Sequence, residues 1–123
     1  MIDKTHAEQE QEKLDSSPLG NHTAYVNRYD ASLLFPIERA VNWQKRSIDR
    51  RELPFLQQAG AVDIWNGYEI SWLNLKGKPI VRVAQFRFSA HSSHIIESKS
   101  FKLYLNSYNL SEFSSERAVI EQM

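Results

Sequence analysis

The sequence contains no cysteine among its 123 residues. This absence excludes disulfides, thiolate metal sites and a cysteine nucleophile within the chain. Charge of one sign is also missing, because 15 Lys and Arg residues balance 15 Asp and Glu residues. A net charge of zero gives no general attraction to nucleic acid or to a membrane surface, so any binding must come from a local site.

Long hydrophobic runs are absent as well. No segment approaches the roughly 18 consecutive apolar residues of a membrane-spanning helix. The N-terminus lacks a basic start followed by an apolar run, so no signal peptide is visible, and we expect a cytoplasmic protein. The composition, 41% hydrophobic and 24% charged, is ordinary for a globular protein. The length fits one small domain or part of a larger one.

Three segments differ in character. Residues 1–24 are polar and contain no Phe, Trp or Tyr, which predicts a flexible tail. Residues 25–60 mix aromatic anchors with turn formers and show no sustained period, which predicts an ordered but mostly irregular arm. Residues 61–123 carry the periodic patterns and therefore predict the folded module.

Residues 63–88 predict an antiparallel hairpin, because two runs of alternating apolar residues flank a turn marked by Gly77 and Pro79. The residues expected on its buried face are Ile64, Tyr68, Ile70 and Trp72 in the first run and Ile80, Ala84, Phe86 and Phe88 in the second. Arg82 is the exception on that face. Val81 and Val83 indicate that the opposite face is partly covered too.

A change of period predicts two helices, at about residues 98–108 and 114–123. The first has one apolar face, made of Phe101, Tyr104, Leu105 and Tyr108. Ser98 or Ser100 could cap this helix and Ser114 the second one, because a hydroxyl accepts hydrogen bonds from first-turn N–H groups. Two strands and two helices leave both edges of the hairpin open, so we expect the front of a longer protein.

Polar groups gather where the first helix begins. The stretch IESKSFKLYLNS places Glu97, Ser98, Lys99, Ser100 and Lys102 within six residues. A helix start offers free N–H donors and the positive end of the dipole, so with the two lysines it suits a phosphate. The Glu97 carboxylate could accept two parallel N–H bonds from a guanine-like edge. The plain alternative is a capped surface helix with solvated lysines.

Two other clusters favour ordinary roles. His91 and His94 lack a third ligand and an HExxH context, so they are interpreted as loop histidines and no metal site is expected. Five basic residues surround Trp43 and could contact RNA phosphates, but acidic residues dilute them, which favours a solvated face or a subunit contact. These basic residues are Arg39, Lys45, Arg46, Arg50 and Arg51.

The octapeptide ESKSFKLY, residues 97–104, resembles the signature of the QueF family, the NADPH-dependent nitrile reductases that act on 7-cyano-7-deazaguanine in queuosine biosynthesis. The resemblance extends over about residues 17–113, with SPLG, YDASLLFPI, LPF, DIWNGYEISWLN, KGKP and IESKSFKLYLNSYN in the order of the N-terminal half of the two-module form. The resemblance thus identifies the N-terminal module of a longer enzyme.

Membership implies an α+β tunnelling fold (T-fold), an antiparallel sheet with two helices in the order ββααββ. The chain would supply ββαα, and the closing strands and a second module would follow Met123. The family reduces the nitrile to the amine of 7-aminomethyl-7-deazaguanine with two NADPH, after a cysteine thiolate adds to the nitrile carbon and with an aspartate supplying protons. Both residues belong to the second module of the two-module form, so this chain alone should be inactive.

The resemblance also implies roles for single residues. Ile96, Glu97 and Ser98 would bind the deazaguanine substrate, and Ser98, Lys99, Ser100 and Lys102 would bind NADPH. The implied partners are the C-terminal module and further copies in a homo-oligomer, without direct contact to nucleic acid or membrane. The alternative is a non-catalytic T-fold module for binding or oligomerisation. A reading frame that continues past Met123 into a module with Cys and a following Asp would favour the enzyme.

Overall fold

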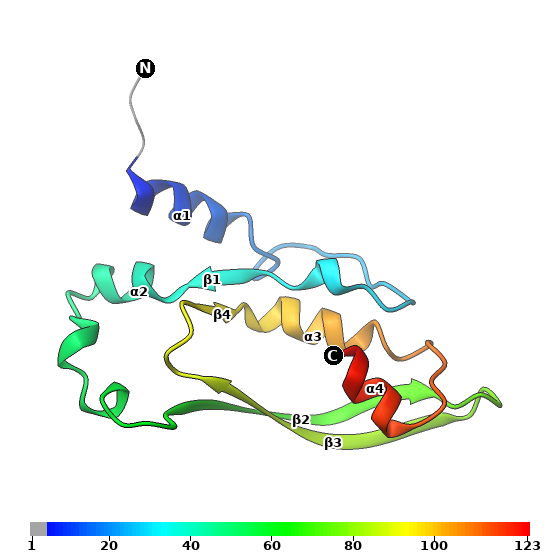
Figure 1. The fold of residues 1–123 in the computed structure, drawn as a ribbon. Coiled ribbons are helices and arrows are strands. Elements are labelled where there is room, and N and C mark those ends of the chain that lie inside the picture. Colours follow the sequence, from blue (N-terminus) through cyan, green and yellow to red (C-terminus); the bar gives the residue numbers. More distant parts are fainter. Residues whose placement is uncertain (1–4) are drawn as a thin grey trace.

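In the part of the chain that the structure describes, the fold combines two small antiparallel sheets with four α-helices (Figure 1). The structure, a computed structural model, describes residues 5–123. Its elements are α1 (His6–Asp15), β1 (Pro36–Glu38), α2 (Arg39–Lys45), β2 (Val62–Leu73), β3 (Pro79–Ser89), β4 (His94–Ile96), α3 (Ser98–Asn106) and α4 (Glu116–Gln122), with 3-10 turns at Ala31–Leu33, Arg50–Glu52 and Pro54–Leu56. The β2–β3 hairpin followed by α3 and α4 is the α+β, T-fold-like arrangement that the sequence predicts.

A bulge interrupts the β2–β3 hairpin. Gly67 lies opposite Ala84 whereas Ile70 lies opposite Arg82, so three steps along β2 match two along β3. A Cβ at Gly67 would lie 2.6 Å from Cδ1 of Ile70. A side chain here would have to displace the end of the buried Ile70 side chain, so glycine suits the bulge.

The bulge reverses which side chains of β2 face α3. Trp65 before it and Ile70 and Trp72 after it pack into the core, whereas Ile64 and Tyr68 are 49% and 72% exposed. The prediction that Ile64 and Tyr68 share the buried face was wrong. Its physical reason is that one extra residue shifts a period-2 pattern to the other side of the sheet, and the glycine within the strand was the available signal.

The core lies between the hairpin and α3, which runs along one face of β2 and β3 (Figure 1). Phe101 makes edge-to-face contacts with Trp65, Phe86 and Phe88 at centroid distances of 5.5, 5.0 and 6.1 Å. Each such pair contributes about 0.5–1.5 kcal/mol beyond its buried area. The predicted apolar helix face is confirmed, since Phe101, Tyr104 and Tyr108 are buried and Leu105 is half-buried.

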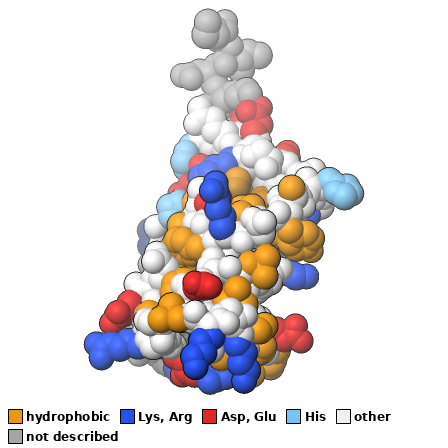
Figure 2. Space-filling model, turned by 90° about the vertical axis from the view of Figure 1, so that its right-hand side faces the viewer, with side chains coloured by type: hydrophobic (Ala, Val, Ile, Leu, Met, Phe, Trp, Pro, Cys, Tyr) orange, Lys and Arg blue, Asp and Glu red, His pale blue; other side chains and the backbone are white. Residues whose placement is uncertain are grey.

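The opposite face of the hairpin is open in the described part of the chain. Val81 and Val83 are both exposed. None of residues 5–123 buries them, although the sequence predicts that this face is partly covered. Figure 2 shows hydrophobic side chains lying among charged ones on the side of the molecule where the hairpin turn and α4 lie. Among the described residues, no helix has the length and apolar character to cross a membrane.

The N-terminal part is more regular than the sequence predicts. Helix α1 forms inside the segment predicted as a flexible tail, because Thr5 and Glu8 make a capping box; residues 1–4 of that segment lie outside the described residues. The arm at 25–60 contains α2 and contributes β1, which pairs with β4 through Ile37 and Ile95. Three-residue strands carry too little periodic signal to be seen in the sequence.

Candidate ligand site at the start of helix α3

Glu97 caps helix α3 with its own side chain. Its carboxylate accepts the backbone N–H groups of Lys99 at 2.6 Å and Ser100 at 2.8 Å, and the residue is only 2% exposed. The prediction of Ser98 or Ser100 as the cap was therefore wrong, because the longer glutamate side chain folds back over the first turn. Helix α4 shows a smaller shift, since Ser115 rather than Ser114 accepts the N–H of Ala118.

This cap changes the electrostatics of the site. A carboxylate at the positive end of the helix dipole is favourable. The Glu97 carboxylate accepts two of the N–H groups that the sequence analysis assigned to a phosphate. An anion at the start of α3 would therefore find these two N–H donors occupied unless Glu97 moves. The sequence shows that the carboxylate and the lysines lie at the same helix start. It does not show that the carboxylate occupies the N–H donors there.

Ser100 holds the backbone of Glu97 in place through hydrogen bonds inside the protein. It is fully buried, and its hydroxyl donates to the backbone oxygen of Glu97 at 2.7 Å and accepts the N–H of Phe35 at 3.0 Å. The N–H of Glu97 in turn donates to the carbonyl of Phe35 at 2.8 Å. The hydroxyl of Ser100 is thus used inside the protein, and the residue orients the helix start rather than facing a ligand.

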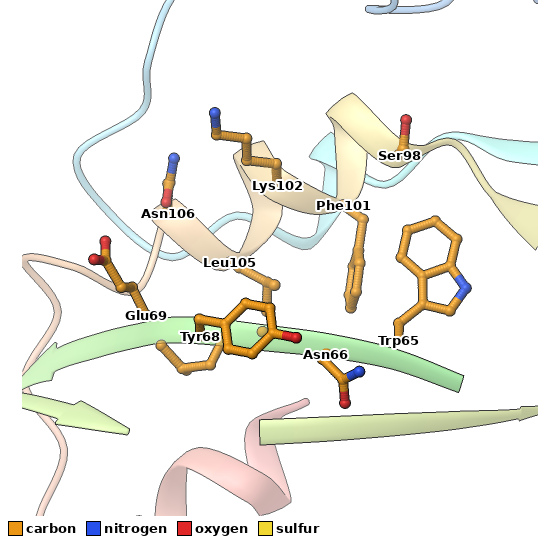
Figure 3. A pocket seen from close by; sticks show the side chains of 11 residues that line it. Trp65, Asn66, Tyr68, Glu69, Ser98, Phe101, Lys102, Leu105 and Asn106 are labelled. Carbon is orange, nitrogen blue, oxygen red and sulfur yellow. The ribbon is translucent and has the colours of Figure 1, made fainter. Parts of the chain in front are cut away.

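Ser98 and Lys102 come together at the rim of a groove of about 440 Å³ between α3 and β2. Figure 3 shows Phe101 and Leu105 pointing from α3 toward β2, whereas Lys102 and Asn106 point away from the strand. The floor is thus apolar and the rim offers a hydroxyl, an ammonium and an amide. A ligand with a flat ring and an anionic group suits this combination.

The groove is also lined by the bulged part of β2. Its residues there are Trp65, Asn66, Gly67, Tyr68, Glu69 and Ile70. The extra residue directs Tyr68 outward, so the bulge shapes the strand side of the site. Sequence reasoning missed these strand residues and Asn106, and Gly67 was the one local signal for them.

Lys99 lies apart from Lys102. Its ammonium donates to the backbone oxygen of Asn21, and it lines an open depression with His22 and Tyr25. Lys99 and Lys102 are three positions apart and so only about 60° apart around the helix, but their long side chains extend to different neighbours. The structure brings Ser98 and Lys102 into one groove, but it does not bring Lys99 there.

Ile96 lines a third and smaller cavity, of about 170 Å³, together with Arg39 and Asp63. Arg39 donates to the Asp63 carboxylate at 2.5 Å and its side chain is 10% exposed. This ion pair was not predicted, since the two residues are 24 positions apart. Arg39 therefore belongs to a packed ion pair and not to a basic surface for RNA.

Several other charged and polar groups have local partners. Arg51 holds the pKa of the Asp49 carboxyl down at about 2 by hydrogen bonding and charge, and the guanidinium of Arg50 lies over the Trp43 ring at 5.3 Å. Burial raises the pKa of both Tyr104 and Tyr108, so these hydroxyls stay protonated and serve packing rather than acid–base chemistry.

The two histidines of the HxxH pattern behave as surface residues. The Nδ1 atom of His94 lies 2.8 Å from the hydroxyl of Ser93. Among the described residues, the group whose geometry could hold a metal ion lies elsewhere and includes neither His91 nor His94.

Known proteins with similar sequences give the context for this site. The family profile described as "Nitrile reductase, 7-cyano-7-deazaguanine-reductase N-term" matches residues 25–123. The NADPH-dependent 7-cyano-7-deazaguanine reductase of Hydrogenovibrio crunogenus is 54% identical over 106 residues, which is 86% of this chain and 37% of that protein. The protein of the same name from Chromohalobacter salexigens is 49% identical over 110 residues, 89% of this chain and 38% of that protein. The chain therefore spans little more than a third of the length of these relatives.

Proposed function

The chain belongs to the 7-cyano-7-deazaguanine nitrile reductase family and matches the N-terminal part of these proteins. We propose that it is the N-terminal module of an enzyme that reduces 7-cyano-7-deazaguanine to 7-aminomethyl-7-deazaguanine with NADPH, a step toward queuosine modification of tRNA. The observation that carries the proposal is the family match over residues 25–123, which includes the ESKSFKLY stretch at the start of α3. The intact enzyme would act in the cytoplasm.

NADPH supplies hydride when it is bound, and the residues at the α3 groove fit part of such a ligand. Lys102 would neutralise a phosphate, Ser98 would donate a hydrogen bond, and the apolar floor at Phe101 would take a ring. These inferences are supported by the groove of about 440 Å³ that the three residues line. Lys99 would bind a second anionic group from its own depression, in exchange for its bond to the Asn21 carbonyl.

Substrate recognition by Ile96, Glu97 and Ser98 requires an exchange of hydrogen bonds. Glu97 would accept two N–H groups of the deazaguanine edge in place of those of Lys99 and Ser100. Hydrogen bonds to a charged group are worth roughly 1.5–3 kcal/mol each, so two new bonds offset two lost ones. The exchange would free two first-turn N–H donors, which could then bind an anion. Ser100 would keep the role of orienting the helix start.

The thiolate nucleophile would come from the rest of the enzyme, because the chain has no cysteine, and we expect the proton-donating carboxylate there too. This chain would then form one wall of a shared site and contribute binding and orientation. Further copies of the protein would assemble with it as a homo-oligomer, and neither nucleic acid nor membrane would be a direct partner.

The test is NADPH oxidation by the intact protein, followed with and without 7-cyano-7-deazaguanine. We expect oxidation that depends on the nitrile and that yields the primary amine, identified by mass spectrometry. Lys102→Ala should weaken it, whereas Lys76→Ala, a lysine exposed in the β2–β3 turn, should not. Intact protein that oxidises no NADPH with this nitrile would refute the proposal.

A further inference from the structure

A second group of polar side chains lies far from α3 in the chain, where α1 meets the junction of β1 and α2. His6 and Glu10 are one turn apart on α1, and Glu38 ends β1. The Nε2 atom of His6 lies 2.8 Å from Oε2 of Glu38. One nitrogen or oxygen atom from each of the three residues lies within 4.8 Å of the others.

The two carboxylates of this group are held close together and are partly buried. The side chains of Glu10 and Glu38 are only 17% and 26% exposed. Two carboxylates at this distance repel each other, and burial strengthens the repulsion. The ammonium of Lys13 lies 3.9 Å from Glu10, near the edge of ion-pair range. A cation between the carboxylates would offset the repulsion far better.

We infer that His6, Glu10 and Glu38 bind one divalent metal ion of the zinc class. An imidazole nitrogen with two carboxylate oxygens is a ligand set that suits zinc and its neighbours, whereas magnesium prefers oxygen ligands alone. Zinc binds such ligands at about 2.0–2.2 Å, which places them roughly 3.4 Å from one another. Rotation of the glutamate side chains, which have three rotatable bonds each, brings the oxygens to that spacing. A water would complete the tetrahedron.

The metal would fasten α1 to the folded module. Among the described residues, a side-chain contact between Lys45 and Gln11 also joins α1 to α2. A metal bound by two residues of α1 and one of β1 replaces a hydrogen bond between exposed groups with a three-point link. His6 and Glu10 precede the residues that match the family, 25–123, and none of the three ligands lines the α3 groove, so the zinc test does not depend on the proposed reductase function.

The experiment is zinc titration of the intact protein after treatment with a chelator, by calorimetry. We expect the wild type to bind one more equivalent of zinc than each of the variants His6→Ala, Glu10→Gln and Glu38→Gln. If a variant still binds that zinc, its affinity should be lower by well over tenfold, because changes to outer-shell residues alone cost about tenfold or more. His22→Ala and Glu52→Gln, which alter the same residue types outside the cluster, should keep the wild-type stoichiometry. Cobalt should give visible absorption bands that the His6→Ala variant lacks.

A second measurement guards against variants that fail to fold. Zinc should slow proteolytic cleavage within residues 16–24 in the wild type and in both control variants, but not in the three cluster variants. Circular dichroism of the zinc-free variants should match the wild type. Equal zinc stoichiometry and affinity in all six proteins would overturn the proposal. Binding that responds to magnesium as strongly as to zinc, and ignores His6→Ala, would overturn it as well.

Discussion

The hydroxyl of Ser100 accepts the backbone N–H of Phe35 at 3.0 Å and so joins the start of α3 to a residue 65 positions earlier in the chain. The same hydroxyl donates to the backbone oxygen of Glu97. One buried side chain therefore sets the position of the helix start relative to the segment that leads into β1. The proposed ligand groups on the first turn of α3 depend on this link.

Replacing Ser100 by alanine should lower the stability of the protein. The change leaves the N–H of Phe35 without its acceptor in a partly buried place, and such a loss costs about 1–3 kcal/mol. The midpoint of denaturant unfolding should fall accordingly. Ser98→Ala is the matched control, because Ser98 is exposed and should leave the midpoint nearly unchanged. Equal midpoints for the two variants would contradict the role given to Ser100.

Glu97 should show two separable roles. Loss of an N-terminal cap costs about 0.5–2 kcal/mol, so Glu97→Ala should lower the unfolding midpoint. Glu97→Gln keeps an acceptor for one first-turn N–H and should lose less stability. It places an amide where the deazaguanine edge needs a second acceptor, so it should still raise the KM for the nitrile. A glutamine variant with unchanged KM would leave Glu97 with the capping role alone.

Lys102 should contribute to NADPH binding through its charge. Lys102→Ala should raise the KM for NADPH about tenfold or more, because a charge-assisted hydrogen bond is worth roughly 1.5–3 kcal/mol. The difference between wild type and variant should shrink at high salt, since the group is exposed and screened. Steady-state kinetics at two ionic strengths give both values, with Lys76→Ala as the control. The same KM in wild type and Lys102→Ala would remove this residue from the site.

Replacing Gly67 by alanine should lower the stability of the protein. An added Cβ would lie 2.6 Å from Cδ1 of Ile70 and 3.3 Å from Cε2 of Phe86. Gly67→Ala must therefore displace packed side chains, which costs about 1–3 kcal/mol. Asn66→Ala alters the exposed neighbour and should be nearly neutral in the same unfolding measurement. Reduced NADPH turnover in Gly67→Ala at temperatures where it stays folded would show that the bulge also shapes the groove.

The hairpin, the apolar face of α3 and the family could all be predicted from the sequence alone. The first two follow from the spacing of apolar residues within one element, which is a local property. The family follows from a long ordered set of motifs around ESKSFKLY. The charge cluster at Glu97, Lys99 and Lys102 was also visible, because these residues are neighbours in the chain.

How these groups are used depends on contacts between distant parts of the chain, which appear only in the folded structure. The extra residue at Gly67 turned Tyr68 outward, a register effect that depends on the partner strand. Glu97 caps the start of α3, and Lys99 contacts Asn21 instead of the groove that Lys102 lines. The ion pair of Arg39 with Asp63 and the meeting of His6 with Glu38 join distant parts of the chain. Such contacts depend on packing between elements, which no local pattern encodes.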